Sequence, residues 1–128
     1  MNILVLGNGA REHALCFSIA KSDQLSKLYC APGNYGISKI AEVHNFDINN
    51  FDILYDFCLA NKIDLVVVGP EVPLVNGVVD FLSDKKIMAF GPKKIPAGLE
   101  GSKIFMKDIC SKYNIPTAAY KSFKEKKL

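Results

Sequence analysis

The sequence predicts an α/β domain with a doubly wound, mostly parallel sheet of five strands, which is a Rossmann-like arrangement. Segments with strand character alternate with segments of helical periodicity, as expected for a sheet that helices cover on both faces. The run Leu65–Val68 is apolar without interruption, which is typical of a strand buried on both faces. A glycine-rich turn directly follows the first strand, where domains of this class bind anions.

The first half of the chain predicts three strands and two helices. Residues 3–6 are apolar and end at Gly7, so a strand passes through a turn into a helix. One proline and two glycines in the segment 32–36 end the second strand, because they continue neither periodic structure. Apolar side chains recur at helical spacing from Phe51 to Cys58. The expected elements are a strand over 2–6, a helix over 11–21, a strand over 27–31, a weaker strand over 41–45 and a helix over 50–61.

The second half predicts two strands and three helices. The clearest strand covers 64–69, and an amphipathic helix over 74–83 follows it. A fifth strand over 87–90 ends at Gly91 and Pro92. A short helix is expected over 94–99 and a longer one over 102–113, and the segment around Pro116 ends the latter.

Composition and charge exclude several classes of protein. With 128 residues, of which 49% are hydrophobic and 23% charged, the chain is expected to form one domain with a real core. Its apolar stretches are too short to span a membrane, and no basic region precedes the first of them, so no secretory signal is expected. The four cysteines lack zinc-site spacing and are expected to be reduced and buried, which indicates the cytoplasm.

Positive charge is concentrated at the C-terminal end. Residues 1–100 hold nine Lys and Arg against eleven Asp and Glu, whereas residues 101–128 hold seven against two. No recognised nucleic-acid motif accompanies this basic stretch. Nucleic acid is therefore not expected as a partner.

Three glycine-containing loops, 7–9, 32–36 and 69–71, each follow the carboxyl end of a predicted strand. These ends meet at one edge of a doubly wound sheet, so we expect the loops to share a ligand site. In the first loop, Gly7 and Gly9 permit close approach, and the N–H groups from Asn8 to Arg11 face the site at a helix N-terminus. The Arg11 side chain offers a fork for phosphate oxygens.

Three further side chains near these loops carry charge or can titrate. Glu71 lies between Pro70 and Pro73, and its carboxylate can accept two hydrogen bonds from a ribose diol. The alternative for Glu71 is a glutamate at a helix start that is satisfied by its own N-terminus. Glu12 suits the helix dipole in the same way, and His13 has no metal-ligand partner near it.

The first loop departs from the dinucleotide-binding fingerprint. Glu12 stands where that fingerprint has its third glycine, and the end of the second strand, residues 29–32, carries no acid. The sequence thus argues against NAD and for a smaller, singly phosphorylated ligand. A non-catalytic module that binds a nucleotide or effector stays open, although Tyr35 is the one aromatic residue in these loops that can stack on a base.

Five motifs occur in order over nearly the whole chain. They are Gly-Asn-Gly-Ala-Arg-Glu-His-Ala at 7–14, Ala-Pro-Gly-Asn at 31–34, Val-Gly-Pro-Glu-Val-Pro-Leu-Val at 68–75, Leu-Glu-Gly-Ser-Lys at 99–103 and Ile-Pro-Thr-Ala at 115–118. Together they resemble the phosphoribosylamine–glycine ligase (glycinamide ribonucleotide synthetase) family of purine biosynthesis. Ala10 departs from that pattern, because the family usually has a glycine there.

The resemblance implies a pre-ATP-grasp, substrate-binding domain over 1–100 and a linker helix over 101–128 that begins an ATP-grasp region. The 5′-phosphate of phosphoribosylamine would lie at 7–11 and the ribose hydroxyls at Glu71, with 32–34 as a wall near the ribose or amine. Lys103 would reach toward ATP phosphates. The implied substrate-binding residues are Gly7, Asn8, Gly9, Ala10, Arg11, Pro32, Gly33, Asn34, Gly69, Pro70 and Glu71, with no catalytic residue and no metal ligand.

The family enzyme is much longer than this chain, which resembles only its N-terminal part. The resemblance implies ATP and Mg²⁺ as cofactors of the full-length enzyme and phosphoribosylamine or glycinamide ribonucleotide as ligands of this part. Without the ATP-grasp lobes the chain alone is expected to be inactive and to need no cofactor. Ile104, Phe105, Ile109 and Phe123 are expected to need partners in those lobes, so rapid proteolysis is expected within 114–128.

Overall fold

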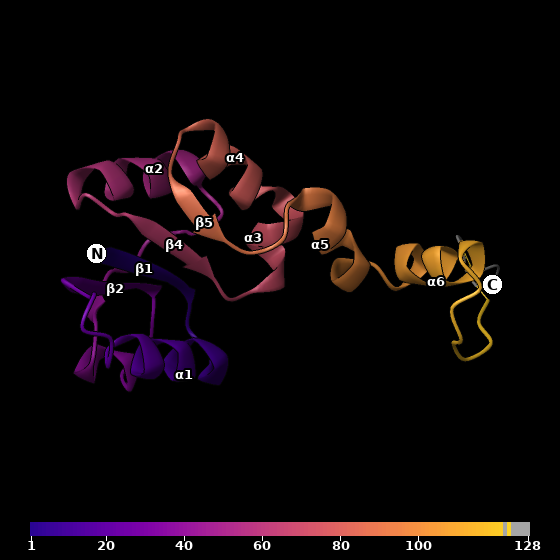
Figure 1. The fold of residues 1–128 in the computed structure, drawn as a ribbon, viewed down its shortest axis with the longest axis horizontal. Helices are drawn as coiled ribbons and strands as arrows, with labels where there is room; N and C mark the ends of the chain where they lie inside the picture. The colour runs from indigo at the N-terminus through magenta and orange to yellow at the C-terminus, as the bar shows by residue number, and fades with distance from the viewer. Residues whose placement is uncertain (122, 124–128) are drawn as a thin grey trace, which may run out of the picture.

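A single parallel sheet of five strands organises the molecule (Figure 1). The computed structural model describes residues 1–121 and 123. The strands are β1 (Asn2–Gly7), β2 (Lys27–Pro32), β3 (Glu42–Val43), β4 (Leu65–Val68) and β5 (Met88–Phe90). They lie in the order β3-β2-β1-β4-β5, so the predicted doubly wound α/β fold is confirmed. The chain runs outward from β1 through β2 to β3 and then returns to β4 on the other side of β1, which opens a crevice at the carboxyl ends of β1 and β4.

Helices cover both faces of the sheet (Figure 1). The helix α1 (Ala10–Ile19) and the 3₁₀ turn η1 (Ile37–Lys39) lie on one face. On the other face lie α2 (Phe51–Ala60), α3 (Glu71–Asn76) and α4 (Val78–Asp84). The register places Gly7 beside Pro32 and Leu6 beside Val68, so the carboxyl ends of β1, β2 and β4 are level with one another.

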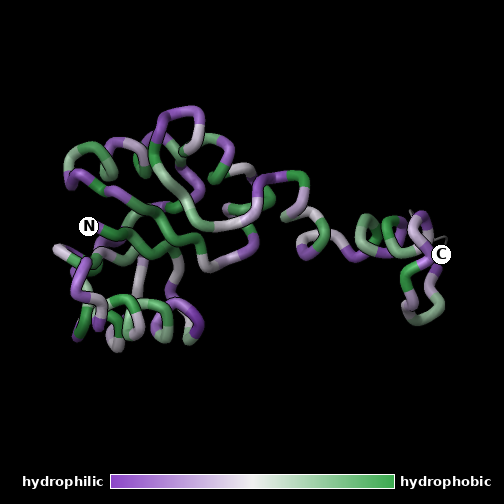
Figure 2. The backbone as a smooth tube through the Cα atoms, viewed as in Figure 1, coloured by the Kyte–Doolittle hydropathy of each residue, from purple (hydrophilic) through white to green (hydrophobic). Residues whose placement is uncertain are grey.

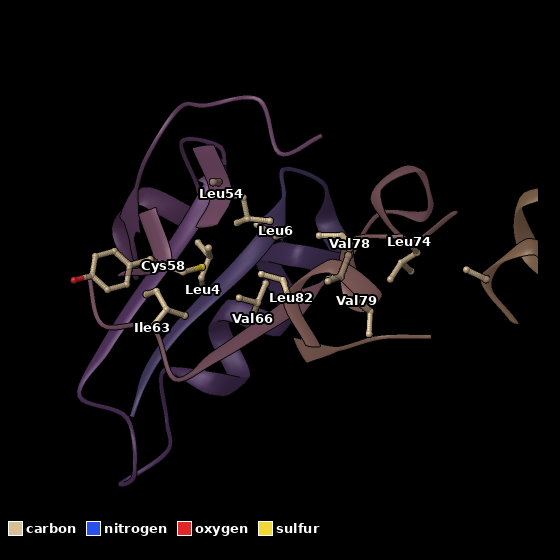
Figure 3. Close-up of a cluster of buried hydrophobic side chains, with 14 residues drawn as sticks. Leu4, Leu6, Leu54, Cys58, Ile63, Val66, Leu74, Val78, Val79 and Leu82 are labelled. Carbon is tan, nitrogen blue, oxygen red and sulfur yellow. The ribbon is translucent and has the colours of Figure 1, made fainter. Parts of the chain in front are cut away.

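Two hydrophobic clusters flank the sheet because side chains alternate along its strands. Leu4 and Leu6 of β1 belong to the cluster under α2 and α4 (Figure 3), whereas Val5 belongs to the cluster under α1. All three are fully buried. Each such side chain stabilises the fold by about 1.5–3 kcal/mol. The central strand β1 is therefore held in place from both faces, and the turn that follows it is held with it.

The single helix predicted over 74–83 is wrong, because the structure contains two helices there. α3 begins at Glu71 and ends before Gly77, which is left-handed with φ of 95°, and α4 then begins at Val78. Glycine takes this conformation at a helix end without a steric cost. Pro73 is tolerated inside α3 because the first-turn N–H that it lacks has no intrahelical partner.

Other predicted elements agree with the structure within a few residues. The weaker strand shrinks to the two residues of β3. The N-cap of α2 is Asn50, whose side-chain oxygen accepts a hydrogen bond from the backbone N–H of Ile53 at 3.2 Å. Such a cap stabilises a helix by about 1 kcal/mol. No helix in the described part of the chain is both long and apolar enough to cross a membrane.

The C-terminal helices project away from the sheet (Figure 1). α5 (Lys94–Gly101) contacts α3, and α6 (Lys103–Lys112) extends beyond α5. Figure 2 shows hydrophobic residues along β1 and β4 in the body and again on the projecting α6. Ile104 is 53% exposed and Phe123 is 74% exposed. That these side chains need partners stays a prediction, and residues 122 and 124–128 of the segment predicted to be cleaved lie outside the described residues.

Candidate functional site

Loops from four strands line a cleft at the carboxyl edge of the sheet. Its volume is about 380 Å³. The lining residues are Gly7, Asn8, Glu12, Pro32, Asp47, Ile48, Asn49, Pro70, Val72 and Pro73. The structure thus brings together the three loops singled out in the sequence and adds a fourth, the segment 47–49 between β3 and α2.

The loops after β1 and β2 are tied to each other by hydrogen bonds. The backbone N–H of Gly33 donates to the carbonyl oxygen of Gly7 at 3.1 Å. The Asn34 side-chain amide donates to the carbonyl oxygen of Asn8 at 2.8 Å, and its oxygen accepts from the N–H of Ile37 at 2.9 Å. Gly7 and Gly33 have φ of 126° and 66°, in the region that glycine adopts freely. These contacts hold the floor of the cleft in one shape.

Glu12 is buried at the centre of the loops, with 5% of its surface exposed. Its carboxylate accepts a hydrogen bond from the backbone N–H of Gly9 at 2.7 Å, which is the glutamate half of a capping box, since Gly9 has no side chain to form the other half. A Cβ atom at Gly7 would lie 2.5 Å from the Cγ atom of Glu12, and one at Gly69 would overlap its carboxylate. The glycines of two loops therefore clear the space that this side chain fills.

Burial of Glu12 is a feature that the sequence interpretation missed. Its place in the first turn of α1 is as predicted, but a side chain that merely complements the helix dipole stays in solvent. Two features of the sequence together were the available signal. Glycines stand at positions 7, 9 and 69, and an acid, Glu12, stands where dinucleotide-binding loops have their third glycine. This signal becomes visible only when β1 and β4 are known to be neighbours.

Arg11 and Glu71 form an ion pair between the first turns of α1 and α3, and neither residue is among those that line the cleft. One terminal nitrogen of Arg11 donates to the carbonyl oxygen of Gly69 at 2.9 Å, and the other donates to the Glu71 carboxylate at 3.0 Å. The backbone N–H of Glu71 lowers the pKa of its own carboxyl group, and Arg11 lowers it further. The hydrogen bond to Glu71 in turn raises the pKa of Arg11. Both side chains are partly exposed, so this pair contributes little to stability.

The N-terminus of α1 keeps N–H groups available for an anion. The N–H of Gly9 is taken by Glu12. The N–H groups of Ala10 and Arg11 lie in the first turn, where no intrahelical acceptor is available. Together with the helix dipole they favour a bound anion next to the cleft.

Other residues that drew attention in the sequence lie outside the cleft. Lys103 is exposed in the first turn of α6 and does not line the cleft. The ring of His13 packs beside Gly36. The four cysteines are buried and unpaired, and burial raises the pKa of Cys58 to about 12. Within residues 1–121 and 123, no three His, Cys, Asp or Glu side chains are grouped so as to hold a metal ion.

Asp47 and Asn49 are cleft residues that the sequence interpretation missed. They lie in the segment between β3 and α2, which contains neither a glycine nor a recognised motif. The available signal was the polar set Asp47, Asn49 and Asn50, which is typical of a turn that leads into a helix.

Comparison with known proteins places the chain among similar proteins of one family. Residues 1–100 match the family described as phosphoribosylglycinamide synthetase, N domain. Phosphoribosylamine–glycine ligase of Mesorhizobium japonicum is 56% identical over 98% of this chain and 29% of its own length. The enzyme of the same name from Caldanaerobacter subterraneus is 48% identical over 96% of this chain and 30% of its own length. The chain therefore spans about 30% of the length of these relatives.

Solved structures give the same result. The crystal structure of phosphoribosylamine–glycine ligase from Thermotoga maritima superposes with a TM-score of 0.64 and 29% identity, over 93% of this chain and 26% of that one. The biotin carboxylase domain of a thermophilic 2-oxoglutarate carboxylase superposes with a TM-score of 0.69 over 91% of this chain and 28% of that one, but at 18% identity it shares the fold alone. With the motif order, the cleft and the match over residues 1–100 in agreement, this chain belongs to the phosphoribosylglycinamide synthetase family, as its N domain.

Proposed function

We propose that this domain binds the phosphoribosyl substrate of phosphoribosylamine–glycine ligase. The ligand is 5-phosphoribosylamine before the reaction and glycinamide ribonucleotide after it, in the ATP-dependent joining of glycine to the amine in purine biosynthesis. One observation carries the proposal: a cleft of about 380 Å³ lies at the carboxyl ends of the neighbouring strands β1 and β4, next to the first turn of α1 and the first turn of α3, which begins at Glu71. An anion-binding helix end beside a hydroxyl acceptor matches a phosphorylated sugar.

The 5′-phosphate binds at the N-terminus of α1. Free N–H groups of Ala10 and Arg11, together with the helix dipole, supply the attraction. The buried carboxylate of Glu12 already occupies the space between the ends of β1 and β4. This favours a single phosphate over the pyrophosphate of a dinucleotide, because the latter needs a close approach along the same turn.

The ribose hydroxyl groups bind to Glu71. Without ligand, this carboxylate and the Arg11 guanidinium satisfy each other at 3.0 Å. Ligand binding exchanges this contact for a hydroxyl–carboxylate bond and a guanidinium–phosphate bond, so neither charged group is left without a partner. The loop over 32–34, tied to the first loop, forms the wall on the other side of the sugar.

The rest of the ligation belongs to the remaining length of the synthetase. The described residues do not fit a magnesium–nucleotide site, since no three acidic, His or Cys side chains converge among them. This domain contributes by orienting the amine toward the activated glycine, which accounts for a large part of the rate of a reaction between two substrates. Lys103 reaches the nucleotide phosphates only in the full-length enzyme, and the 128-residue chain by itself catalyses nothing.

The compartment of this reaction is the cytoplasm. All four cysteines are buried and unpaired, which is the state expected in a reducing compartment. The substrate is a phosphorylated intermediate, and the relatives that carry the same name are biosynthetic ligases.

Calorimetric titration of the chain with glycinamide ribonucleotide tests the proposal, with AMP and NAD as comparison ligands. Glu71→Ala is expected to weaken binding of the product at least tenfold, about 1.4 kcal/mol. Asp56→Asn, an exposed change on α2 away from the cleft, is the matched control and leaves binding unchanged. Preferential binding of NAD or AMP would overturn the assignment.

A further inference from the structure

The segment between β3 and α2 forms a polar wall of the cleft. Phe46 and Ile48 pack against the hydrophobic cluster under α2 and α4. Residues 48 and 49 form a turn, in which the backbone N–H of Asn50 donates to the carbonyl oxygen of Asp47 at 3.0 Å. Asp47, Ile48 and Asn49 line the cleft. Phe46 thus anchors the segment, and Asp47 and Asn49 are the polar residues that it presents to the cleft.

Two hydrogen bonds from Asn49 hold one carboxylate oxygen of Asp47. Its Oδ1 atom accepts from the backbone N–H of Asn49 at 2.9 Å and from the side-chain amide of the same residue at 3.3 Å. The side-chain oxygen of Asn49 accepts in turn from Asn76 at 3.4 Å, at the end of α3. The wall is therefore connected to the helix that carries Glu71.

The Asp47 carboxylate faces the cleft without a counter-charge. Over residues 1–121 and 123, no Lys, Arg or His nitrogen lies within 4.0 Å of it. None of the residues that line the cleft is a lysine or arginine. The other acid there, Glu12, is already bonded to the N–H of Gly9. Asp47 Oδ2 forms no hydrogen bond within the described residues, so one oxygen of a charged carboxylate is available to a ligand.

We propose that Asp47 determines the specificity of this cleft by binding the amine-bearing end of the phosphoribosyl ligand. The inference rests on the proposed function and extends it to a residue outside the motifs of the family. An unpaired carboxylate repels a phosphate and attracts N–H donors, most strongly a charged ammonium group. The phosphate therefore lies at the N-terminus of α1, and the amino end lies at Asp47 on the β3 side.

This arrangement sets the direction of the ligand in the cleft. Glu71 binds the hydroxyl groups from the β4 side and Asp47 binds the nitrogen from the β3 side. A ligand with a hydroxyl group in place of the amine loses the charged contact but keeps the phosphate and ribose contacts. Asp47 thus distinguishes an aminated phosphoribose from ribose 5-phosphate.

Titration of the wild-type chain and two variants with two ligands tests this inference. Glycinamide ribonucleotide carries an amide N–H at the sugar and an ammonium group at its glycyl end, and ribose 5-phosphate carries neither. Asp47→Asn keeps an acceptor oxygen for the N–H of Asn49 but removes the charge, and Asp47→Ala removes both. We expect both variants to lose at least tenfold in affinity for glycinamide ribonucleotide and less than twofold for ribose 5-phosphate. Asp52→Asn, on the exposed first turn of α2, is the matched control and changes neither.

Each other outcome speaks against the inference. An equal loss for both ligands means that Asp47 acts only through the shape of the loop, and unchanged affinity for glycinamide ribonucleotide means that it does not touch the amine. Retained binding of ribose 5-phosphate by Asp47→Asn is the internal check that the cleft is intact. If the wild-type chain binds neither ligand, the proposed function is overturned, and this inference with it. If the wild-type chain binds glycinamide ribonucleotide and the Asp47 variants bind it equally well, only the inference about Asp47 is overturned.

Discussion

Gly69 is the position where one added methyl group tests the packing of the buried glutamate. It directly follows β4, and its N–H donates to the carbonyl oxygen of Leu6 at 3.1 Å. Its backbone is not in the left-handed region, so alanine is allowed there by backbone conformation. A Cβ atom at this position would overlap the Oε1 atom of Glu12 and lie 2.6 Å from its Cγ atom. The Gly69→Ala change must therefore displace the Glu12 side chain.

The cost of this displacement has two parts. A hydrogen bond to a charged group, here the 2.7 Å bond from the Gly9 N–H, contributes about 1.5–3 kcal/mol. Forcing an extra methyl group into a packed interior costs about 1–3 kcal/mol. We therefore expect Gly69→Ala to lower the free energy of unfolding by about 2.5–6 kcal/mol, a large share of the 5–15 kcal/mol typical of a domain.

Urea denaturation followed by circular dichroism measures the effect, since the chain has no tryptophan. With a urea dependence of about 2 kcal/mol per molar, the midpoint is expected to fall by roughly 2 M. Gly98→Ala is the matched control. A Cβ atom at Gly98 meets the Phe105 ring at 3.4 Å, an ordinary contact, and helical alanine is favoured over glycine by about 0.5–1 kcal/mol.

A double-mutant cycle identifies the cause. In a Glu12→Ala background the methyl group at position 69 has no side chain to displace, so most of its cost should disappear. The explanation based on Glu12 is refuted if Gly69→Ala lowers the free energy of unfolding as much in the Glu12→Ala background as in the wild type. It is also refuted if, in the wild type, Gly69→Ala lowers that free energy no more than Gly98→Ala does.

Three further predictions concern titration, reactivity and proteolysis. The Glu71 carboxyl should titrate below its ordinary pKa in a ¹³C NMR titration, and Arg11→Ala should raise that pKa only in part, because the backbone N–H of Glu71 is the larger cause. Because the pKa of Glu71 is lowered in the folded state, the small stabilisation from its ionised carboxylate is present at neutral pH and is lost as pH falls through that pKa. A Glu71 pKa that is the same in Arg11→Ala as in the wild type would contradict the predicted contribution of Arg11. With a pKa raised to about 12 by burial, Cys58 should resist iodoacetamide at pH 8 until urea unfolds the chain, and rapid labelling of the native chain would show that the thiol is accessible. Trypsin should cut first within 114–128, near the exposed Lys121, whereas a first cut within residues 1–100 would show that the body opens before the C-terminal segment.

The fold and the position of the site could be predicted from short-range patterns. Apolar runs, helical spacing and turn residues act over a few neighbours in the chain, so they place strands, helices and loops near their observed bounds. The cluster of loops at one edge also follows, because parallel strands all end on the same side. The helix break at Gly77 escaped prediction, since an amphipathic pattern continues across a left-handed glycine.

By itself, the sequence determined the class of fold, the loops that carry glycine and the motif order that marks the family. Only the tertiary structure decided what the charged residues of those loops do. It buries Glu12 against Gly69, pairs Arg11 with Glu71 and brings Asp47 into the cleft. Arg11 and Glu71 are 60 residues apart in the chain and meet because β4 returns to lie beside β1. Strand order arises from packing across the whole sheet, which no local pattern encodes, whereas the elements themselves arise from local periodicity.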